Sequence, residues 1–295
     1  CKYAIYNIVF LENERHVIFS KNITIILIKI KSLLFAIFAT AALFVACDVI
    51  PEEDRLEVVQ MEPSDRNVLL LEFTGWKCVN CPSAAVVAHT LVEALGQNVV
   101  VVAMHPEGHG FTTPENTVNA LSTADAMEYL KFYGGSSATA FPTGVVNGVK
   151  FDGEYLQGKD EWIAQVMEQR AIAPDCFIDL TYSKDDAHKV VATITPDTTM
   201  DYNVSLQMWL VENNIVAPQA SQGNSYVHQH VFRKALNPMW GDELGKITEA
   251  TSKEYSFEIE SRYVVDNCAV VAVLINTETK EVIQASQVDL GNGAH

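Results

Sequence analysis

Two cysteines separated by two residues, Cys78 and Cys81, have the clearest chemical potential in this sequence. They follow an apolar run with strand character, Val68 to Phe73, and precede a helix-like segment that ends near Gly96. The unpaired N–H groups and the dipole at a helix N-terminus both favour a thiolate over a thiol. We therefore expect Cys78, beside Lys77, to be the nucleophile of a dithiol and Cys81 to resolve a mixed disulfide.

Cysteines at this spacing also occur as half of a zinc site. A structural zinc site needs four ligands, commonly two such pairs. The sequence has no second pair, because Cys176 and Cys268 stand alone. We therefore favour redox chemistry and expect neither a metal nor a cofactor.

An acidic residue, Glu72, lies in the apolar strand six positions before Cys78, on the strand face opposite Leu71 and Phe73. If Glu72 is buried, desolvation raises its pKa, and the carboxyl group could exchange a proton with Cys81. The alternative is that Glu72 reaches solvent at a strand end.

These residues resemble the thioredoxin superfamily, in which a strand carrying an acid runs into W-C-x-x-C. Glu72 has the spacing of that acid and Trp76 corresponds to the tryptophan, although Lys77 stands between Trp76 and Cys78. The resemblance implies an α/β thioredoxin-like domain and thiol–disulfide exchange with protein thiols or disulfides.

A second segment carries the same resemblance, Ala140-Phe141-Pro142-Thr143. In thioredoxin-like proteins the proline of such a segment is cis and packs against the dithiol, which implies that role for Pro142. Asn147-Gly148 then predicts a tight turn between strands at 143–146 and 149–152.

The N-terminal part has the pattern of an export signal. Lys29 and Lys31 precede an apolar run that ends at Cys47, too short for a comfortable membrane span. The run resembles the lipobox of bacterial lipoproteins, which implies that Cys47 is lipidated and holds the protein on a membrane. The alternatives are a simple signal peptide and an uncleaved anchor helix.

Composition and strand patterns predict four segments. Residues 1–46 are an upstream extension with the lipoprotein signal peptide, and 47–66 are a lipidated acidic tether. Residues 67–173 form the thioredoxin-like domain. Residues 174–295 form an all-β, immunoglobulin-like sandwich, because seven short runs with strand patterns follow one another there. Those runs are 176–183, 188–196, 202–212, 226–235, 254–260, 268–275 and 281–288.

Two groups of histidines in these segments are candidate ligands. His105, Glu107 and His109 follow a buried strand, and they fit either a metal site or, better, an ordinary loop. Strand alternation over 226–232 puts Tyr226, His228, His230 and Phe232 on one face. That face is either a ligand patch or, as we favour, a packed or half-exposed aromatic surface.

The two remaining cysteines, Cys176 and Cys268, lie near predicted strand starts. They form either a structural disulfide, which would stabilise the fold by roughly 2–4 kcal/mol, or two separately buried thiols.

The chain is strongly acidic, with a net charge of −17 at pH 7. Such a surface argues against nucleic acid and against electrostatic attachment to anionic lipid, since both need basic patches. We therefore expect the N-terminal lipid, rather than surface charge, to attach the protein to the membrane.

The runs 210–219 and 226–233, with the export signal and dithiol, resemble a Bacteroidetes family of outer-membrane lipoproteins named for a protein of twenty-eight kilodaltons. The resemblance implies a cell-envelope location, lipid-anchored at the outer membrane. It leaves two hypotheses: a membrane-anchored thiol–disulfide oxidoreductase, and a non-catalytic surface binding or adhesion lipoprotein whose dithiol is a structural disulfide.

Overall fold

The computed structural model describes residues 65–114, 119–184 and 187–291. The predicted signal peptide over 1–46, Cys47 with its predicted lipid, and nearly all of the predicted tether lie outside the described residues. Within the described ranges, no helix is both long enough and apolar enough to cross a membrane.

The described residues fold into a β-rich structure with few helices, which confirms the predicted abundance of strands. The helices are α2 (Cys81–Leu95), α3 (Ala124–Phe132) and α4 (Trp162–Arg170), with 3-10 turns η2 (Gly96–Asn98) and η3 (Val265–Asn267). The strands are β1 (Val68–Phe73), β2 (Val99–Met104), β3 (Thr143–Val146), β4 (Cys176–Lys184), β5 (His188–Pro196), β6 (Val204–Glu212), β7 (Ile215–Gln219), β8 (Gly223–His228), β9 (Val231–Ala235), β10 (Asp242–Gly245), β11 (Thr251–Phe257), β12 (Cys268–Asn276) and β13 (Val282–Asp289).

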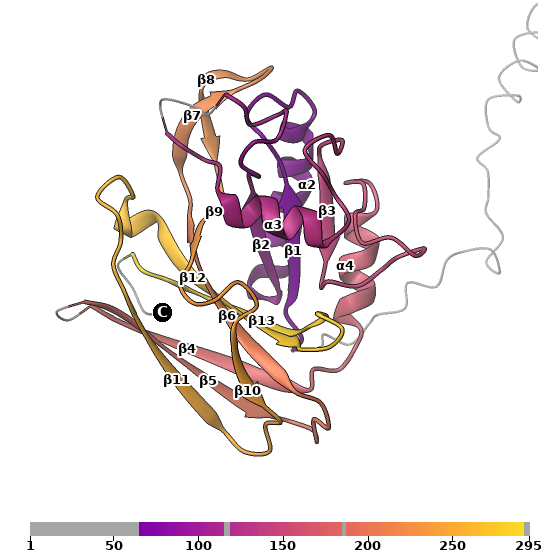
Figure 1. Ribbon diagram of the computed structural model, residues 1–295, viewed down its shortest axis with the longest axis vertical. Helices are drawn as coiled ribbons and strands as arrows, with labels where there is room; N and C mark the ends of the chain where they lie inside the picture. The colour runs from indigo at the N-terminus through magenta and orange to yellow at the C-terminus, as the bar shows by residue number, and fades with distance from the viewer. Residues whose placement is uncertain (1–64, 115–118, 185–186, 292–295) are drawn as a thin grey trace, which may run out of the picture. The chain divides into compact units, whose positions relative to one another are not determined.

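One large sheet runs through both halves of the described chain (Figure 1). Its strand order is β13-β12-β6-β9-β2-β1-β3, and β10 pairs with β6. β1 and β2 are parallel and joined through α2, whereas β3 is antiparallel to β1. The two halves meet where β9 pairs with β2 in parallel, at Ala103 and Val231. The predicted segments 67–173 and 174–295 therefore contribute strands to a common sheet.

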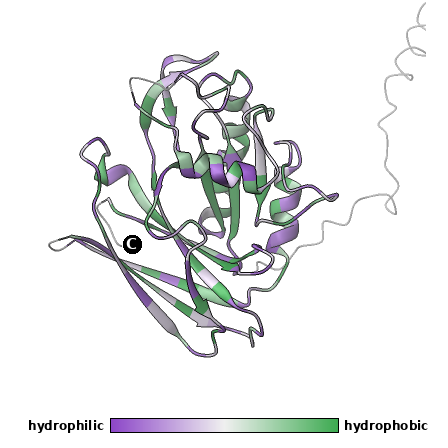
Figure 2. Cartoon of the chain, viewed as in Figure 1, coloured by the Kyte–Doolittle hydropathy of each residue, from purple (hydrophilic) through white to green (hydrophobic). Residues whose placement is uncertain are grey.

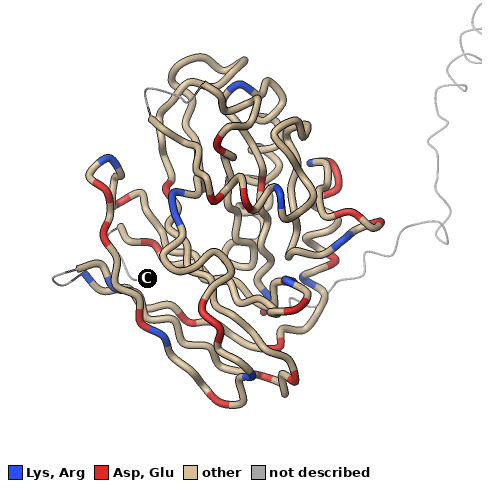
Figure 3. The backbone as a smooth tube through the Cα atoms, viewed as in Figure 1, with Lys and Arg blue, Asp and Glu red and all other residues tan. Residues whose placement is uncertain are grey.

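The strands β6 and β12 are buried on both faces. Their alternate side chains enter different clusters: Leu206 and Val270 face the three-stranded sheet β11-β5-β4, whereas Trp209 and Val271 pack toward α3 and β1. This two-sided burial explains why β12 is apolar from Cys268 to Ile275 and why β6 is mostly apolar, although β6 also buries Ser205, Gln207 and Glu212 (Figure 2). Charged residues instead mark the loops, the helices and the outer strands (Figure 3).

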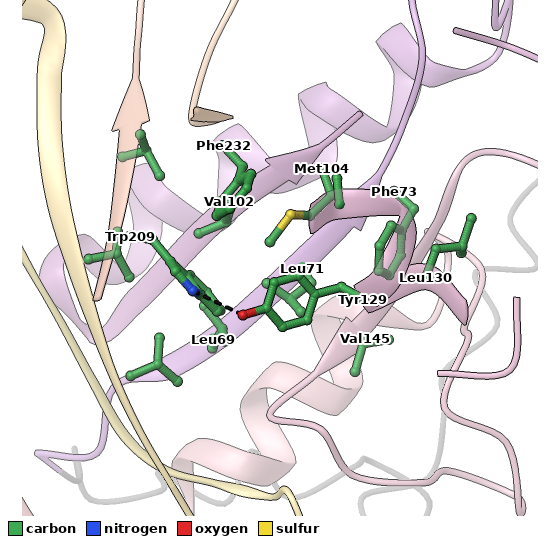
Figure 4. Packing of buried hydrophobic residues seen from close by; sticks show 14 of the residues in the cluster. Leu69, Leu71, Phe73, Val102, Met104, Tyr129, Leu130, Val145, Trp209 and Phe232 are labelled. Carbon is green, nitrogen blue, oxygen red and sulfur yellow. Dashed lines mark hydrogen bonds between the residues drawn. The ribbon is translucent and has the colours of Figure 1, made fainter. Parts of the chain in front are cut away.

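The cluster on the α3 side joins both halves through aromatic side chains. Trp209 of β6 and Phe232 of β9 lie against Tyr129 of α3 and against side chains of β1 and β2 (Figure 4). The Trp209 indole donates a hydrogen bond of 3.1 Å to the Tyr129 hydroxyl, which in turn donates to the Met239 carbonyl at 2.6 Å. A buried polar pair of this kind fixes α3 on the sheet, because each group has its partner there.

Two predicted strands differ from the structure. The turn at Asn147-Gly148 forms, with φ of 50° and 62°, and the Val149 N–H donates to the Val146 carbonyl. Residues 149–152 do not return along β3, because Gly144 pairs with Gln157 instead.

The predicted strand 226–235 is broken into β8 and β9. At the break His230 takes a φ of 56°, its N–H bonds to the side chain of Asn213, and its carbonyl bonds to the Ala103 N–H. The chain thus passes from the β7–β8 hairpin into the large sheet. Tyr226, His228 and His230 nevertheless line one cavity, whereas Phe232 enters the core cluster, so the prediction that all four share one face is wrong only for Phe232.

We predict that Tyr129→Phe destabilises the protein by about 1–3 kcal/mol, because the Trp209 N–H and the Met239 carbonyl lose a buried partner. Urea unfolding followed by tryptophan fluorescence measures the change. Tyr155→Phe is the matched control, because the half-buried Tyr155 has ring contacts but no hydroxyl hydrogen bond to the described residues. Equal stability of the two variants would contradict the role given to the Tyr129 hydroxyl.

Candidate functional site

Cys78 and Cys81 are joined by a disulfide at the entrance to α2. Cys78 lies in the turn that follows β1, and Cys81 is the first residue of the helix. The Cys81 N–H points back at the Cys78 sulfur, 3.1 Å away. The expected location of the cysteines, between a strand and a helix, is confirmed.

The disulfide is covered rather than presented to solvent. Cys78 is 1% exposed and Cys81 is 2% exposed. The turn of the β7–β8 hairpin holds the cysteine loop by three contacts: Gln219 Nε2 donates to the Cys78 carbonyl at 2.7 Å, the Ala220 N–H donates to the Trp76 carbonyl, and the Ser221 hydroxyl donates to the Val79 carbonyl. We call these contacts the hairpin cap.

The hairpin cap was not predicted from the sequence. The segment 215–228 contains two alternating runs around the turn residues Ser221-Gln222-Gly223, and this pattern is the signal that could have indicated a hairpin. Its docking on a loop about 140 residues earlier could not be read from local patterns.

The two residues before Cys78 are held by a neighbouring loop. The Trp76 indole N–H bonds to the carbonyls of Thr112 and Pro114, and the Lys77 ammonium bonds to the Thr113 carbonyl at 2.7 Å. A Cβ on Gly75 would lie 2.6 Å from the Phe111 carbonyl oxygen, so only glycine allows this close approach. The ammonium of Lys77 is therefore engaged with this loop.

Glu72 is buried in the large sheet, on β1 between Ala103 of β2 and Gly144 of the edge strand β3. It is 3% exposed, and it makes no hydrogen bond or ion pair with the described residues. Burial raises its pKa to about 8. Glu72 and Cys81 both line a cavity of about 260 Å³, together with His105, Tyr226 and His228.

The two histidines that follow β2, His105 and His109, lie in different environments. His105 is buried and lines the cavity, whereas His109 stacks on Phe141 with ring centroids 3.9 Å apart. The His109 ring bonds to the Thr139 carbonyl and accepts from the Phe111 N–H, so it orders the loop. Among the described residues, no group of three or more His, Cys, Asp or Glu side chains is arranged to hold a metal ion.

The peptide bond between Phe141 and Pro142 is cis, as the resemblance implied for Pro142. Phe141 belongs to the same buried cluster as both cysteines. The part given to Pro142 in shaping a substrate groove stays a prediction.

Cys176 and Cys268 are free thiols, so the structural disulfide between them is not formed. The two cysteines begin β4 and β12, which belong to different sheets, and both enter the core cluster between those sheets. Burial raises the pKa of each thiol to about 12. The alternative of two separately buried thiols is what the structure contains.

The comparisons with known proteins concern the fold and the family. Residues 127–293 match the family model described as outer membrane protein Omp28. HBP35 of Porphyromonas gingivalis is 19% identical, with a TM-score of 0.62 over 79% of each chain, which shows a shared fold. No curated protein sequence matches the chain.

Two further solved structures are less similar. A protein of Agrobacterium tumefaciens is 16% identical over 77% of this chain and 96% of its own, with a TM-score of 0.49. A domain of the outer membrane lipoprotein Omp28 from Porphyromonas gingivalis is 18% identical over 40% of this chain and 89% of its own, with a TM-score of 0.29.

The raised pKa of Glu72 predicts a dependence of stability on pH. Between the unfolded pKa near 4.3 and the folded pKa of about 8, the folded state binds one more proton than the unfolded state, so stability falls as pH rises. We expect Glu72→Gln to remove a slope of about 1.4 kcal/mol per pH unit between pH 5 and 8, and to be more stable than wild type by about 4 kcal/mol at pH 7.

Urea unfolding of both proteins at several pH values measures this slope. Glu93→Gln is the control, because Glu93 is an exposed carboxylate on α2 paired with His89, and its variant should keep the wild-type slope. Parallel curves for wild type and Glu72→Gln would show that Glu72 is ionised in the folded protein at pH 7.

Proposed function

Because the chain belongs to the Omp28 family of outer membrane proteins, we propose that it is a non-catalytic binding lipoprotein with a structural disulfide on a thioredoxin-like scaffold. The protein is a cell-envelope protein associated with the outer membrane. Its anchor, in this proposal, is a lipid on Cys47, and its partners are reached from the membrane surface.

The burial of the disulfide is the observation that carries this proposal. In thiol–disulfide exchange a thiolate attacks one sulfur and displaces the other, so the attacked sulfur must be accessible. Cys78, the expected nucleophile, is 1% exposed beneath the hairpin cap. A disulfide closed in this way holds the loop between β1 and α2 and does not turn over.

The thioredoxin-like scaffold is supported by the arrangement of the first half. β1 carries a buried acid and leads into the cysteine pair, α2 returns the chain to the parallel strand β2, and a cis proline precedes the antiparallel strand β3. The strands after residue 174 form an immunoglobulin-like part in this proposal, which supplies the hairpin that covers the cysteines.

One observation favours the second candidate, a thiol–disulfide oxidoreductase. Glu72 and Cys81 line the same cavity, and a carboxyl group with a pKa of about 8 can accept or give a proton near neutral pH. In this candidate the hairpin cap must first open. A thiolate of the partner protein then attacks the Cys78 sulfur and forms a mixed disulfide, while the Cys78–Cys81 bond breaks and Cys81 leaves as a thiolate. Protonated Glu72 gives its proton to the Cys81 thiolate. The partners would be protein thiols or disulfides in the cell envelope.

The reactivity of the disulfide separates the two candidates. We expect the full chain in detergent to accelerate the reduction of insulin by dithiothreitol no more than its Cys78→Ser/Cys81→Ser variant does, and its disulfide to have a reduction potential below about −300 mV in dithiothreitol buffers. The double variant Gln219→Ala/Ser221→Ala removes two contacts of the hairpin cap, and we expect its disulfide to react with dithiothreitol at least tenfold faster.

Gln222→Ala is the matched control, because Gln222 is exposed in the same turn. It should react at the wild-type rate. Repeated turnover of insulin by the wild-type protein would establish the oxidoreductase instead.

The anchor is tested separately. We expect Cys47→Ser to abolish labelling by a radioactive fatty acid and to move the protein from the membrane fraction to the supernatant, since one or more acyl chains supply the membrane affinity. Cys176→Ser is the control, because this buried thiol is remote from the N-terminal signal in sequence. Unchanged labelling of Cys47→Ser would exclude lipidation at this cysteine.

A further inference from the structure

The cavity beside the disulfide is bounded by three elements. α2 contributes Cys81 and His89, the strands β1 and β2 contribute Glu72 and Ala103, and the β7–β8 hairpin contributes Tyr226 and His228. Its volume of about 260 Å³ is near the lower end for small-molecule sites, so it suits a small group rather than an extended ligand.

The base of the cavity carries polar atoms that have no partner in the described residues. Glu72 is buried with no hydrogen bond or ion pair. The Nε2 of His228 also lacks a hydrogen-bond partner, and the buried His105 ring bonds only to the backbone of Ala103. Buried polar groups are almost always paired in folded proteins, so such groups around one cavity indicate a ligand that pairs them.

The charge state of these groups defines the ligand. Burial lowers the pKa of His105 well below its usual value and that of His228 to about 4, so both rings are neutral at pH 7. A neutral imidazole offers one acceptor nitrogen, and Glu72 offers only acceptors once it is ionised, at and above about pH 8. A cation that carries several N–H donors can bond to the ionised Glu72 and to the acceptor nitrogen of each ring, and it balances the charge of Glu72, whereas an anion would be repelled by that charge.

We propose that this cavity binds a cationic nitrogen group, an ammonium or guanidinium, whose charge pairs with Glu72 and whose remaining N–H groups bond to His105 and His228. This inference rests on the proposed binding function and names the ligand class of the site. Such a group belongs either to a free small amine or to a lysine or arginine side chain of a partner protein.

The mouth of the cavity suits an aliphatic stem behind the charged group. Val86 and Val227 line the cavity and are 65% and 43% exposed, and Pro82 and Ala85 add further apolar surface. Apolar surface at the mouth can cover methylene groups while the cationic end reaches Glu72.

Calorimetric titration of the full chain in detergent with n-butylamine at pH 8 tests the proposal. We expect saturable binding that weakens at least tenfold in Glu72→Gln and that butanol and butyrate, of similar size, do not reproduce. Glu93→Gln is the control, because this exposed carboxylate lies on α2 but does not line the cavity. It should bind as wild type does.

The pH dependence gives a second readout. Pairing with the cation requires ionised Glu72, so affinity should rise about tenfold per pH unit up to about pH 8 and then level off. The other titratable groups that line the cavity are His89, His105, Tyr226, His228 and His230. Burial lowers the pKa of His105, His228 and His230, so these rings stay neutral above pH 6, and the slope should vanish in Glu72→Gln.

The source of the group is distinguished by comparing butylamine with the capped peptides acetyl-Gly-Lys-Gly-amide and acetyl-Gly-Arg-Gly-amide. Tenfold tighter binding of a peptide would indicate a partner's side chain, and tighter binding of butylamine would indicate a free amine.

Equal affinities of wild type and Glu72→Gln for butylamine, or no binding of any cationic probe at millimolar concentration, would overturn this inference. Both results leave the inert disulfide of the proposed function intact. Conversely, catalysis of insulin reduction would refute the proposed non-catalytic function, whether or not the cavity binds amines.

Discussion

The pairing of β9 with β2 is the interaction on which the candidate site depends. The Ala103 N–H donates to the His230 carbonyl at 2.8 Å, and this contact brings the second half of the chain against the edge of β2. β8 ends two residues before His230, so the same contact places the β7–β8 hairpin over the cysteine loop. The hairpin then both closes the disulfide and forms one wall of the cavity.

The burial of Glu72 is the main electrostatic cost of this arrangement. The carboxyl group is on β1, which is paired with β2 and β3, and its side chain is only 3% exposed. An apolar residue would suit this place better for stability alone. Its retention beside two neutral histidines is therefore more simply explained by the cavity that it faces than by packing.

Much of the first half follows from local sequence patterns. The positions of β1, α2 and β2 around Cys78 and Cys81 agree with the apolar runs and with Gly96 at the helix end. The burial of Glu72 follows from its place in an otherwise apolar run. The predicted lipidation of Cys47 concerns a residue outside the described ranges.

The site itself depends on contacts between residues far apart in sequence, which local patterns do not contain. Gln219 donates to the carbonyl of Cys78, which is more than a hundred residues earlier in the sequence. A glutamine beside a turn is common, so the residue type alone does not predict this contact. His230 breaks a strand that alternation predicts to be continuous, because its carbonyl is needed by Ala103. Cys176 and Cys268 both begin strands, as predicted, but the strands belong to different sheets.

The separate burial of those two thiols bears on how the protein matures in an oxidising compartment. The four cysteines of the described residues allow three ways of forming two disulfides, and of these four only Cys78 and Cys81 are close in sequence. The short loop between Cys78 and Cys81 closes with a smaller loss of chain entropy than a loop of about a hundred residues does. Once β4 and β12 are packed, burial raises the pKa of Cys176 and Cys268 to about 12, so neither is a reactive thiolate near neutral pH, and among the described residues the Cys78–Cys81 disulfide has no competing thiolate.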